Sequence, residues 1–228
     1  NKGNGIAITD IVVTSGGKDV WIATYDKGLF RTHAEEMRSY YESQSLPEKT
    51  ITLLFRSKTD IFLAVSQNRV YQHNPKSDQF ERVGFEFDLG EIQPVIYSLA
   101  EAYNGDILIG TKDHGLFIWA RSAQLENQFA LQPTIESGGL TSSTIYGIEV
   151  DSNANLWCST QNGIVKLDSK GRLIKRFTAA DGLQGNDFAL GASFTSREGL
   201  IYFGGANGYN RFDPTEVDID RTAPAMRL

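Results

Sequence analysis

The sequence predicts an all-β fold, a β-propeller made of four-stranded antiparallel blades. A short apolar run recurs five times, a second anchor follows each copy at a nearly constant distance, and turn-forming residues separate the runs. Repeats of about 45 residues that each contain several short strands are typical of propeller blades, which bury their faces only by stacking on their neighbours.

The first anchor of each repeat is a bulky residue in an apolar run that continues into small residues. The bulky residues of successive repeats lie 41 to 49 residues apart along the 228-residue chain. The five runs are Val20–Thr24, Ile61–Val65, Ile107–Thr111, Leu156–Thr160 and Ile201–Gly205. The second anchor follows six or seven residues later, at Gly28, Arg69, Gly115, Gly163 and Gly208. Two anchors kept in phase through five copies indicate a true repeat.

The fourth repeat shows the whole unit most clearly. Strands are predicted at 145–150, 156–160, 164–167 and 173–177, and the turns between them are rich in Asn, Asp and Gly. A helical pattern is weak everywhere, and the nearest one, Ala34–Arg38, predicts one short turn at most.

The repeats define the expected organisation of the chain. Five blades are expected at approximately 6–44, 45–92, 93–141, 142–185 and 186–217, followed by a linker at 218–228. The chain does not begin with Met, and we expect it to be a piece of a longer protein. No closing strand is evident, so an open arc is expected to expose two blade faces, which favours self-association or missing partner blades.

Composition excludes several function classes. The net charge of −6 argues against a nucleic-acid partner, and no window is long and apolar enough to cross a membrane, so any membrane contact is expected through segments outside this chain. The single cysteine, Cys158, is expected to be a buried apolar residue rather than a nucleophile. Trp21 and Trp157 occupy equivalent positions and are expected in the core between blades.

No catalytic or metal-binding motif is evident. His33, His73 and His114 have no zinc-site spacing, and there is no nucleophile-elbow motif. The chain is therefore predicted to need no cofactor or metal and not to be an enzyme. Asp26 and Asp113, at equivalent loop positions, are the carboxylate pair that would matter if that prediction failed.

A ligand site is expected on one rim of the propeller. The loop between the second and third strands and the connection entering the first strand should meet there, and loops from all blades converge. Amides, carboxylates and aromatic rings suit sugar hydroxyls and stacking, although turn chemistry alone also explains Asn and Asp in such loops. The candidate residues are Tyr25, Asp26, Tyr97, Lys112, Asp113, His114, Tyr146, Gln161, Asn162, Asn186, Asp187 and Asn207.

The segment Leu156–Asp168 resembles the blade motif of two-component regulator propellers, with a Trp, small residues and then Gly followed by an aliphatic residue. Val20–Phe30 and Ile107–Phe117 are similar, Ile201–Pro214 resembles a last blade, and blade 2 departs because Arg69 replaces the Gly. The resemblance implies the periplasmic sensor region of a hybrid histidine kinase or diguanylate cyclase. It also implies a seven-bladed parent propeller and an immunoglobulin-like domain after the linker.

Three functions are consistent with these features. The first is an extracytoplasmic ligand-sensing module of a bacterial membrane receptor, with carbohydrate or another small ligand. The second is a protein-interaction or dimerisation propeller without a small ligand. The third is a propeller hydrolase or lyase acting on polysaccharide.

Overall fold

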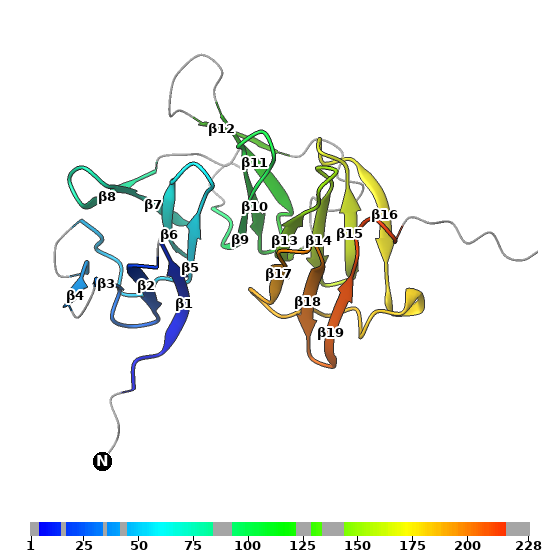
Figure 1. Ribbon diagram of the computed structural model, residues 1–228, viewed down its shortest axis with the longest axis horizontal. Coiled ribbons are helices and arrows are strands. Elements are labelled where there is room, and N and C mark those ends of the chain that lie inside the picture. Colours follow the sequence, from blue (N-terminus) through cyan, green and yellow to red (C-terminus); the bar gives the residue numbers. More distant parts are fainter. Residues whose placement is uncertain are drawn as a thin grey trace, which may run out of the picture.

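The fold consists of five antiparallel sheets that follow one another in chain order (Figure 1). The computed structural model describes residues 5–14, 17–33, 36–41, 45–83, 93–121, 129–133 and 144–217. The predicted linker at 218–228 lies outside the described residues. Four sheets contain four strands each, in simple meander order, and this confirms the predicted all-β propeller fold.

Each blade is one meander, and the bounds of its strands are as follows. Blade 1 contains β1 (Ile8–Val13), β2 (Asp19–Thr24), β3 (Leu29–His33) and β4 (Glu36–Ser39). Blade 2 contains β5 (Leu53–Arg56), β6 (Phe62–Ser66), β7 (Arg69–Asn74) and β8 (Gln79–Arg82). Blade 3 contains β9 (Ile96–Glu101), β10 (Ile107–Thr111), β11 (Leu116–Arg121) and β12 (Phe129–Pro133). Blade 4 contains β13 (Ile145–Val150), β14 (Leu156–Thr160), β15 (Gly163–Leu167) and β16 (Leu173–Phe177). Blade 5 contains β17 (Ser193–Thr195), β18 (Ile201–Gly205) and β19 (Gly208–Phe212), preceded by a 3-10 turn, η1 (Ala179–Asp181).

Two local expectations need correction. The helical turn expected at Ala34–Arg38 was wrong, because Glu36–Ser39 is β4 and pairs with β3, with Phe30 opposite Ser39. Pairing with β3 stabilises these residues as a strand. A single helical turn is too short to be stable by itself. Blade 5 contains three strands among the described residues, not four.

The third strand of blade 5 ends at a local turn. Asp213 accepts hydrogen bonds at Oδ1 from the backbone N–H of Thr215 (2.8 Å) and from its hydroxyl (2.6 Å). This Asx-type turn, with Pro214 inside it, takes the chain out of the extended conformation directly after Phe212. The described chain therefore leaves β19 as the outer strand of its blade.

Tryptophans at equivalent positions fill the core between blades, as predicted. Trp21 is buried in a cluster that includes Leu54 and Phe62 of blade 2. Trp157 is buried against Ile201 and Phe203 of blade 5. Repetition of one structural role in two blades confirms that both rings serve inter-blade packing, which is the main source of stability in stacked repeats.

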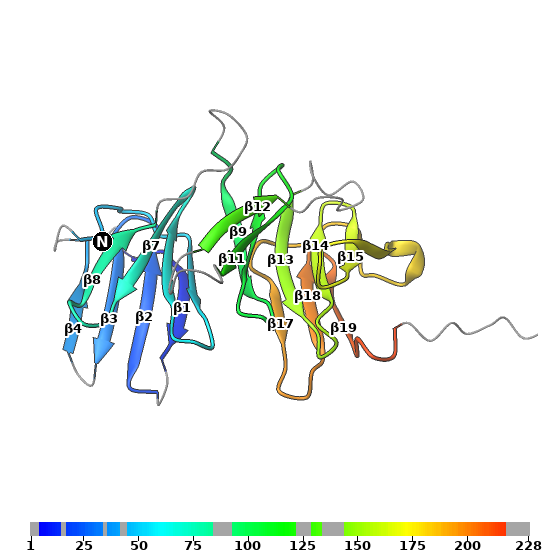
Figure 2. The ribbon, with the colours of Figure 1, turned by 90° about the horizontal axis from the view of Figure 1, so that it is seen from above.

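The blades form an open arc. The first strands of neighbouring blades contact each other in chain order, from β1 through β5, β9 and β13 to β17. Figures 1 and 2 show β1 and β17 well separated in both views, so the first and last blades do not stack on each other. Each end of the arc therefore presents one blade face to solvent.

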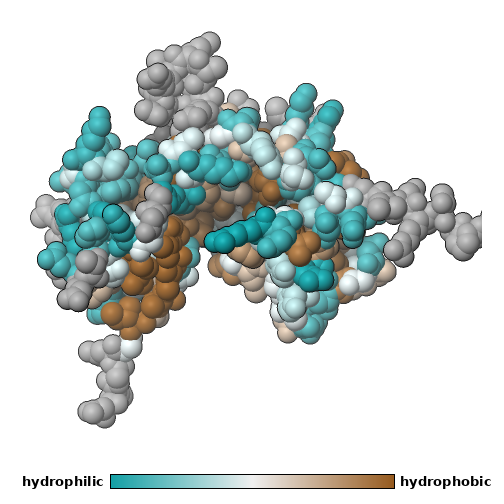
Figure 3. Space-filling view, in the orientation of Figure 1, coloured by the Kyte–Doolittle hydropathy of each residue, from teal (hydrophilic) through white to brown (hydrophobic). Residues whose placement is uncertain are grey.

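The uncovered face of blade 1 is apolar. Val12 packs toward blade 2, so its alternating neighbours Ile11 and Val13 point the other way, and they are 51% and 54% exposed. Figure 3 shows the resulting hydrophobic surface over β1, beside the opening of the arc. At the other end, the Phe194, Tyr202 and Tyr209 rings of blade 5 form a row, with 6.2 Å between successive centroids.

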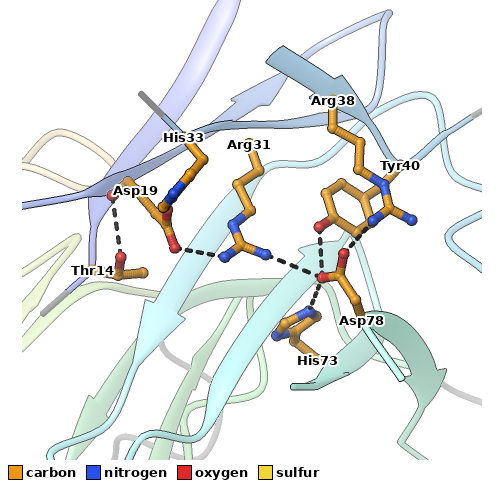
Figure 4. Close-up of polar contacts among 8 residues, drawn as sticks. All are labelled: Thr14, Asp19, Arg31, His33, Arg38, Tyr40, His73 and Asp78. Carbon is orange, nitrogen blue, oxygen red and sulfur yellow. Dashed lines mark hydrogen bonds and ion pairs between the residues drawn. The ribbon is translucent and has the colours of Figure 1, made fainter. Parts of the chain in front are cut away.

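A network of charged residues joins blades 1 and 2 (Figure 4). It lies away from the rim described below, because Asp19 is the first residue of β2 and His33 is the last residue of β3. Asp78, in the turn before β8, accepts hydrogen bonds from Tyr40 Oη (2.8 Å), from Arg31 Nη1 (3.2 Å) and from Arg38 of blade 1. His73 Nε2 of its own blade lies 2.9 Å from the same carboxylate. One aspartate of blade 2 thus holds three side chains of blade 1.

A second aspartate completes this network within blade 1. Asp19 accepts a hydrogen bond from Arg31 Nη2 (2.6 Å) and also pairs with His33. The Arg31 guanidinium in addition lies 5.2 Å from the Trp21 ring centroid. Because its carboxylates are occupied by cationic and hydroxyl partners, the network acts as a clamp between two blades rather than as an open site.

No helix among the described residues is long and apolar enough to cross a membrane.

Candidate functional site

The predicted rim exists, because the loop between the second and third strands of one blade bonds to the connection that enters the next blade. Gly28 N–H donates to the Lys49 carbonyl (2.7 Å) at the junction of blades 1 and 2. Gly163 N–H donates to the Asn186 carbonyl (3.0 Å) at the junction of blades 4 and 5. The rim is therefore a series of inter-blade junctions, and each junction combines loops from two blades.

The junction of blades 3 and 4 contains a stacked pair of tyrosines. Tyr97 and Tyr146 stand at β-bulges, since pairing with the second strand skips each of them. A bulge redirects the side chain of the extra residue, and two equivalent bulges bring these rings together. Their centroids lie 6.2 Å apart with an interplanar angle of 21°, and both side chains are half-buried.

The loop Lys112–His114 lies beside this pair. Lys112 N–H donates to the Val95 carbonyl (2.9 Å), directly before the start of β9. Asp113 makes two hydrogen bonds with Thr144 of blade 4, because its N–H donates to Thr144 Oγ1 (3.1 Å) and its Oδ1 accepts from the same hydroxyl (2.7 Å). These contacts fix the loop against the residues that carry Tyr97 and Tyr146.

The side chains of this loop have different roles. Asp113 has a φ of +62°, and its carboxylate accepts the bond from Thr144, so this residue has a structural role in the loop. His114 Nδ1 lies 2.9 Å from the Lys112 carbonyl oxygen, which orients the ring. Lys112 itself is exposed. Five of the predicted residues, the two tyrosines and this loop, therefore meet at one junction.

The other predicted residues lie at different junctions. Tyr25 is 64% exposed, and its carbonyl accepts a hydrogen bond from the Thr50 hydroxyl. Asp26 is exposed beside it, at the junction of blades 1 and 2. The structure does not bring Asp26 to Asp113, because these aspartates serve separate junctions.

Most predicted residues of blades 4 and 5 have structural hydrogen bonds. Asn186 Oδ1 accepts from Ala179 N–H (2.8 Å), and Asn207 N–H donates to Gln184 Oε1 (3.0 Å). The carbonyl of the exposed Asp187 accepts from Gln184 Nε2 (2.9 Å). Gln161 and Asn162 form the tight turn between β14 and β15, with both side chains exposed.

The prediction omitted a polar pocket at the junction of blades 1 and 2. Glu48 lines it and accepts hydrogen bonds from Arg69 Nη1 (2.6 Å), Tyr71 Oη (2.8 Å) and Ser66 Oγ (3.3 Å). Burial opposes ionisation, but the bonds from Arg69 and Tyr71 lower the pKa of Glu48. Burial, and then the bond to Glu48, raises the pKa of Tyr71 to about 12. The signal in the sequence was Arg69, which replaces the recurring glycine.

Neither a metal site nor a reactive thiol is present in the described part of the chain. No group of three His, Cys, Asp or Glu side chains could hold a metal ion there. Cys158 is fully buried, and burial raises its pKa to about 12, so it is a packing residue as predicted.

Comparisons with known proteins agree with the fold. No protein-family model matches the chain. The chain is 24% identical over 220 residues to a histidine kinase of Formosa agariphila, and the match covers 92% of this chain and 16% of the kinase. The chain thus spans about a sixth of the length of this curated relative.

Solved structures give the same result. The chain superimposes with a TM-score of 0.73 and 18% identity on the extracellular domain of a proposed one-component system of B. thetaiotaomicron. It matches the extracellular domain of a proposed hybrid two-component system of B. thetaiotaomicron with a TM-score of 0.72 and 22% identity. Each match covers 92% of this chain and 28% of the other.

An enzyme also shares the fold. Virginiamycin B lyase of Staphylococcus aureus matches with a TM-score of 0.64 and 13% identity, over 93% of this chain and 72% of the lyase. At this level of identity, these similarities establish the fold.

Proposed function

We propose that this chain is the ligand-sensing propeller module of a bacterial membrane signalling receptor, in its periplasmic part, and that it recognises oligosaccharide. The stacked pair of Tyr97 and Tyr146 carries the proposal. Two half-buried rings on one rim offer flat apolar surface to the C–H face of a sugar, while Lys112 and His114 offer polar groups to its hydroxyls.

The comparisons supply the signalling part of the proposal. The curated relative is a histidine kinase, and two of the structural neighbours are extracellular domains of signalling systems. In the proposed receptor, ligand binding at the rim changes how the propeller transmits to a cytoplasmic kinase or diguanylate cyclase, and the propeller itself catalyses no reaction.

A thermal-shift screen with oligosaccharides tests the proposal. A ligand that binds only the native state raises Tm, and replacement of Tyr97 or Tyr146 by Ala should abolish the shift. Tyr103→Ala is the matched control, because Tyr103 is 58% exposed but lies in the β9–β10 turn on the opposite rim.

The same screen separates the alternatives. Release of shortened products from a polysaccharide would identify a hydrolase or lyase, a role that the lyase fold similarity keeps open. No thermal shift with any saccharide, together with concentration-dependent association, would favour the interaction propeller.

A further inference from the structure

We propose that the pocket between blades 1 and 2 binds an acidic sugar unit, and that it forms a second contact point on the same rim as the tyrosine pair. This inference rests on the proposed function, because it takes the ligand to be a saccharide. The pocket has a volume of about 370 Å³, and its lining includes Tyr41, Glu48, Lys49, Asn68 and Arg69.

The pocket exists because blade 2 is built differently at this point. At the equivalent position a Cβ on Gly28 would lie 2.5 Å from Tyr41 Cβ, and one on Gly163 would lie 2.0 Å from the Phe177 carbonyl oxygen. Those blades thus have no room for a side chain there. In blade 2 the positive φ falls instead on Gln67, at +56°, and Arg69 begins β7 with its side chain half exposed.

The lining carries an excess of positive charge. Glu48 holds the Arg69 guanidinium through Nη1 and neutralises one cation. The Lys49 ammonium is the second cation, exposed and 5.9 Å from the Tyr41 ring centroid. Glu48 is fixed by three donors, so its charge stays paired inside the wall, and the net charge of these groups attracts an anion.

The remaining lining is suited to hydroxyl groups. Gln67 and Asn68 form the two-residue turn between β6 and β7, so their amides border the pocket, and each amide both donates and accepts. A carboxylate attracted by the positive charge that remains after Arg69 pairs with Glu48, next to hydroxyls recognised by amides, describes a sugar acid. A neutral sugar has no carboxylate and would make no ion pair with the positively charged lining of the pocket.

Calorimetry with trigalacturonate and with its neutral counterpart, galactotriose, tests the proposal on the 228-residue chain. The acidic trimer should bind at least tenfold more tightly, and this advantage should fall as NaCl is raised. Lys49→Gln and Arg69→Gln should each weaken binding of the acidic trimer roughly tenfold. Lys170→Gln, an exposed lysine in the turn between β15 and β16, is the charge-matched control and should leave the affinity unchanged.

The outcomes separate this inference from the proposed function. Equal affinity for the two trimers, or acidic binding that survives Lys49→Gln and Arg69→Gln, would overturn the second contact point. If the neutral trimer then still binds the unmodified chain but not Tyr97→Ala, the proposed function stands without the second contact point. If neither trimer nor any other saccharide binds, both fail. Circular dichroism checks that Arg69→Gln remains folded, and exposed Lys49 gives an independent variant.

Discussion

At the residue scale, the recurring glycine is a steric requirement at Gly28 and Gly163, where an added Cβ would clash with neighbouring atoms. Gly163 has a φ of +95°, and a Cβ there would lie 2.0 Å from the Phe177 carbonyl oxygen, an atom of the backbone that cannot rotate away. Gly199 has a similar φ of +84°, with nothing within 4 Å of the added carbon. A comparison of Ala variants at the two positions therefore separates the loss of stability caused by the positive φ from the loss caused by the steric clash.

We therefore expect Gly163→Ala to destabilise the protein by about 3 kcal/mol or more and Gly199→Ala by about 1 kcal/mol. Urea unfolding of the two variants measures the difference. Equal losses would show that the clash at Gly163 is relieved by movement of the chain.

A buried carboxylate gives a second residue-scale prediction. Asp151 is 3% exposed and accepts hydrogen bonds from Trp157 Nε1 (2.9 Å) and from the N–H groups of Asn153 and Asn155 (both 2.9 Å). Asp151→Ala leaves the buried Trp157 indole N–H without an acceptor and also removes the acceptor of the partly buried bonds from Asn153 and Asn155, so we expect a loss of about 2–4 kcal/mol in urea unfolding.

Asp168 is the matched control for Asp151. It accepts the same pattern of backbone bonds, from Lys170 and Arg172, but at the protein surface. Asp168→Ala should cost about 1 kcal/mol, because water replaces the lost acceptor. A comparable loss in both variants would argue that the bond to the Trp157 indole contributes nothing.

At the scale of elements, the sequence predicted strands well where the repeat is strong. Leu156–Thr160 and Leu173–Phe177 have the predicted bounds, because apolar runs and turn residues there act locally. It missed Glu36–Ser39, whose polar residues form a strand only through pairing with β3. The rim could be predicted because equivalent loops of successive repeats lie on the same side of the propeller. The stacking of Tyr97 on Tyr146 could not, because it depends on two β-bulges that the pattern of a single sequence does not reveal.

The clamp between blades 1 and 2 predicts a dependence of stability on pH. Burial pushes the pKa of Asp78 upward, but hydrogen bonds from His73 and Tyr40 and the charges of Arg38 and Arg31 bring it below its usual value of 3.8. Because the folded-state pKa is the lower one, the stabilisation is fully present above the unfolded-state pKa and is lost as pH falls through the folded-state pKa.

Asp78→Asn should therefore lower the free energy of unfolding at pH 7 by about 1–3 kcal/mol and flatten its decline below pH 4. Asp60→Asn, at an exposed ion pair with Arg56, should change it by less than about 1 kcal/mol. Urea unfolding between pH 3 and pH 7 measures both, and an unchanged acid decline in Asp78→Asn would contradict the clamp.

At the scale of the whole molecule, the two uncovered blade faces dominate. The face of blade 1 that contains Ile11 and Val13 is apolar, and the face of blade 5 carries the row of aromatic rings. Exposed patches of this kind drive association unless something covers them. We expect the chain to associate in a concentration-dependent way in light scattering.

Ile11→Lys should reduce that association strongly, since a charge in the centre of the apolar face must stay hydrated. Ile174→Lys is the control, because Ile174 is 49% exposed but lies on β16, the last strand of blade 4. If the unmodified chain is a monodisperse monomer at all concentrations, the exposed apolar face of blade 1 does not drive association.

The strict chain order of the blades also has a kinetic consequence. Every blade is a local meander, and its stacking partners are the blades directly before and after it along the sequence. Such a chain behaves as a nearest-neighbour array, in which the middle repeats gain two interfaces and the end repeats only one. When the 228-residue chain is studied by itself, unfolding should then begin as fraying of blades 1 and 5, and during synthesis on the ribosome each blade can form before the next emerges.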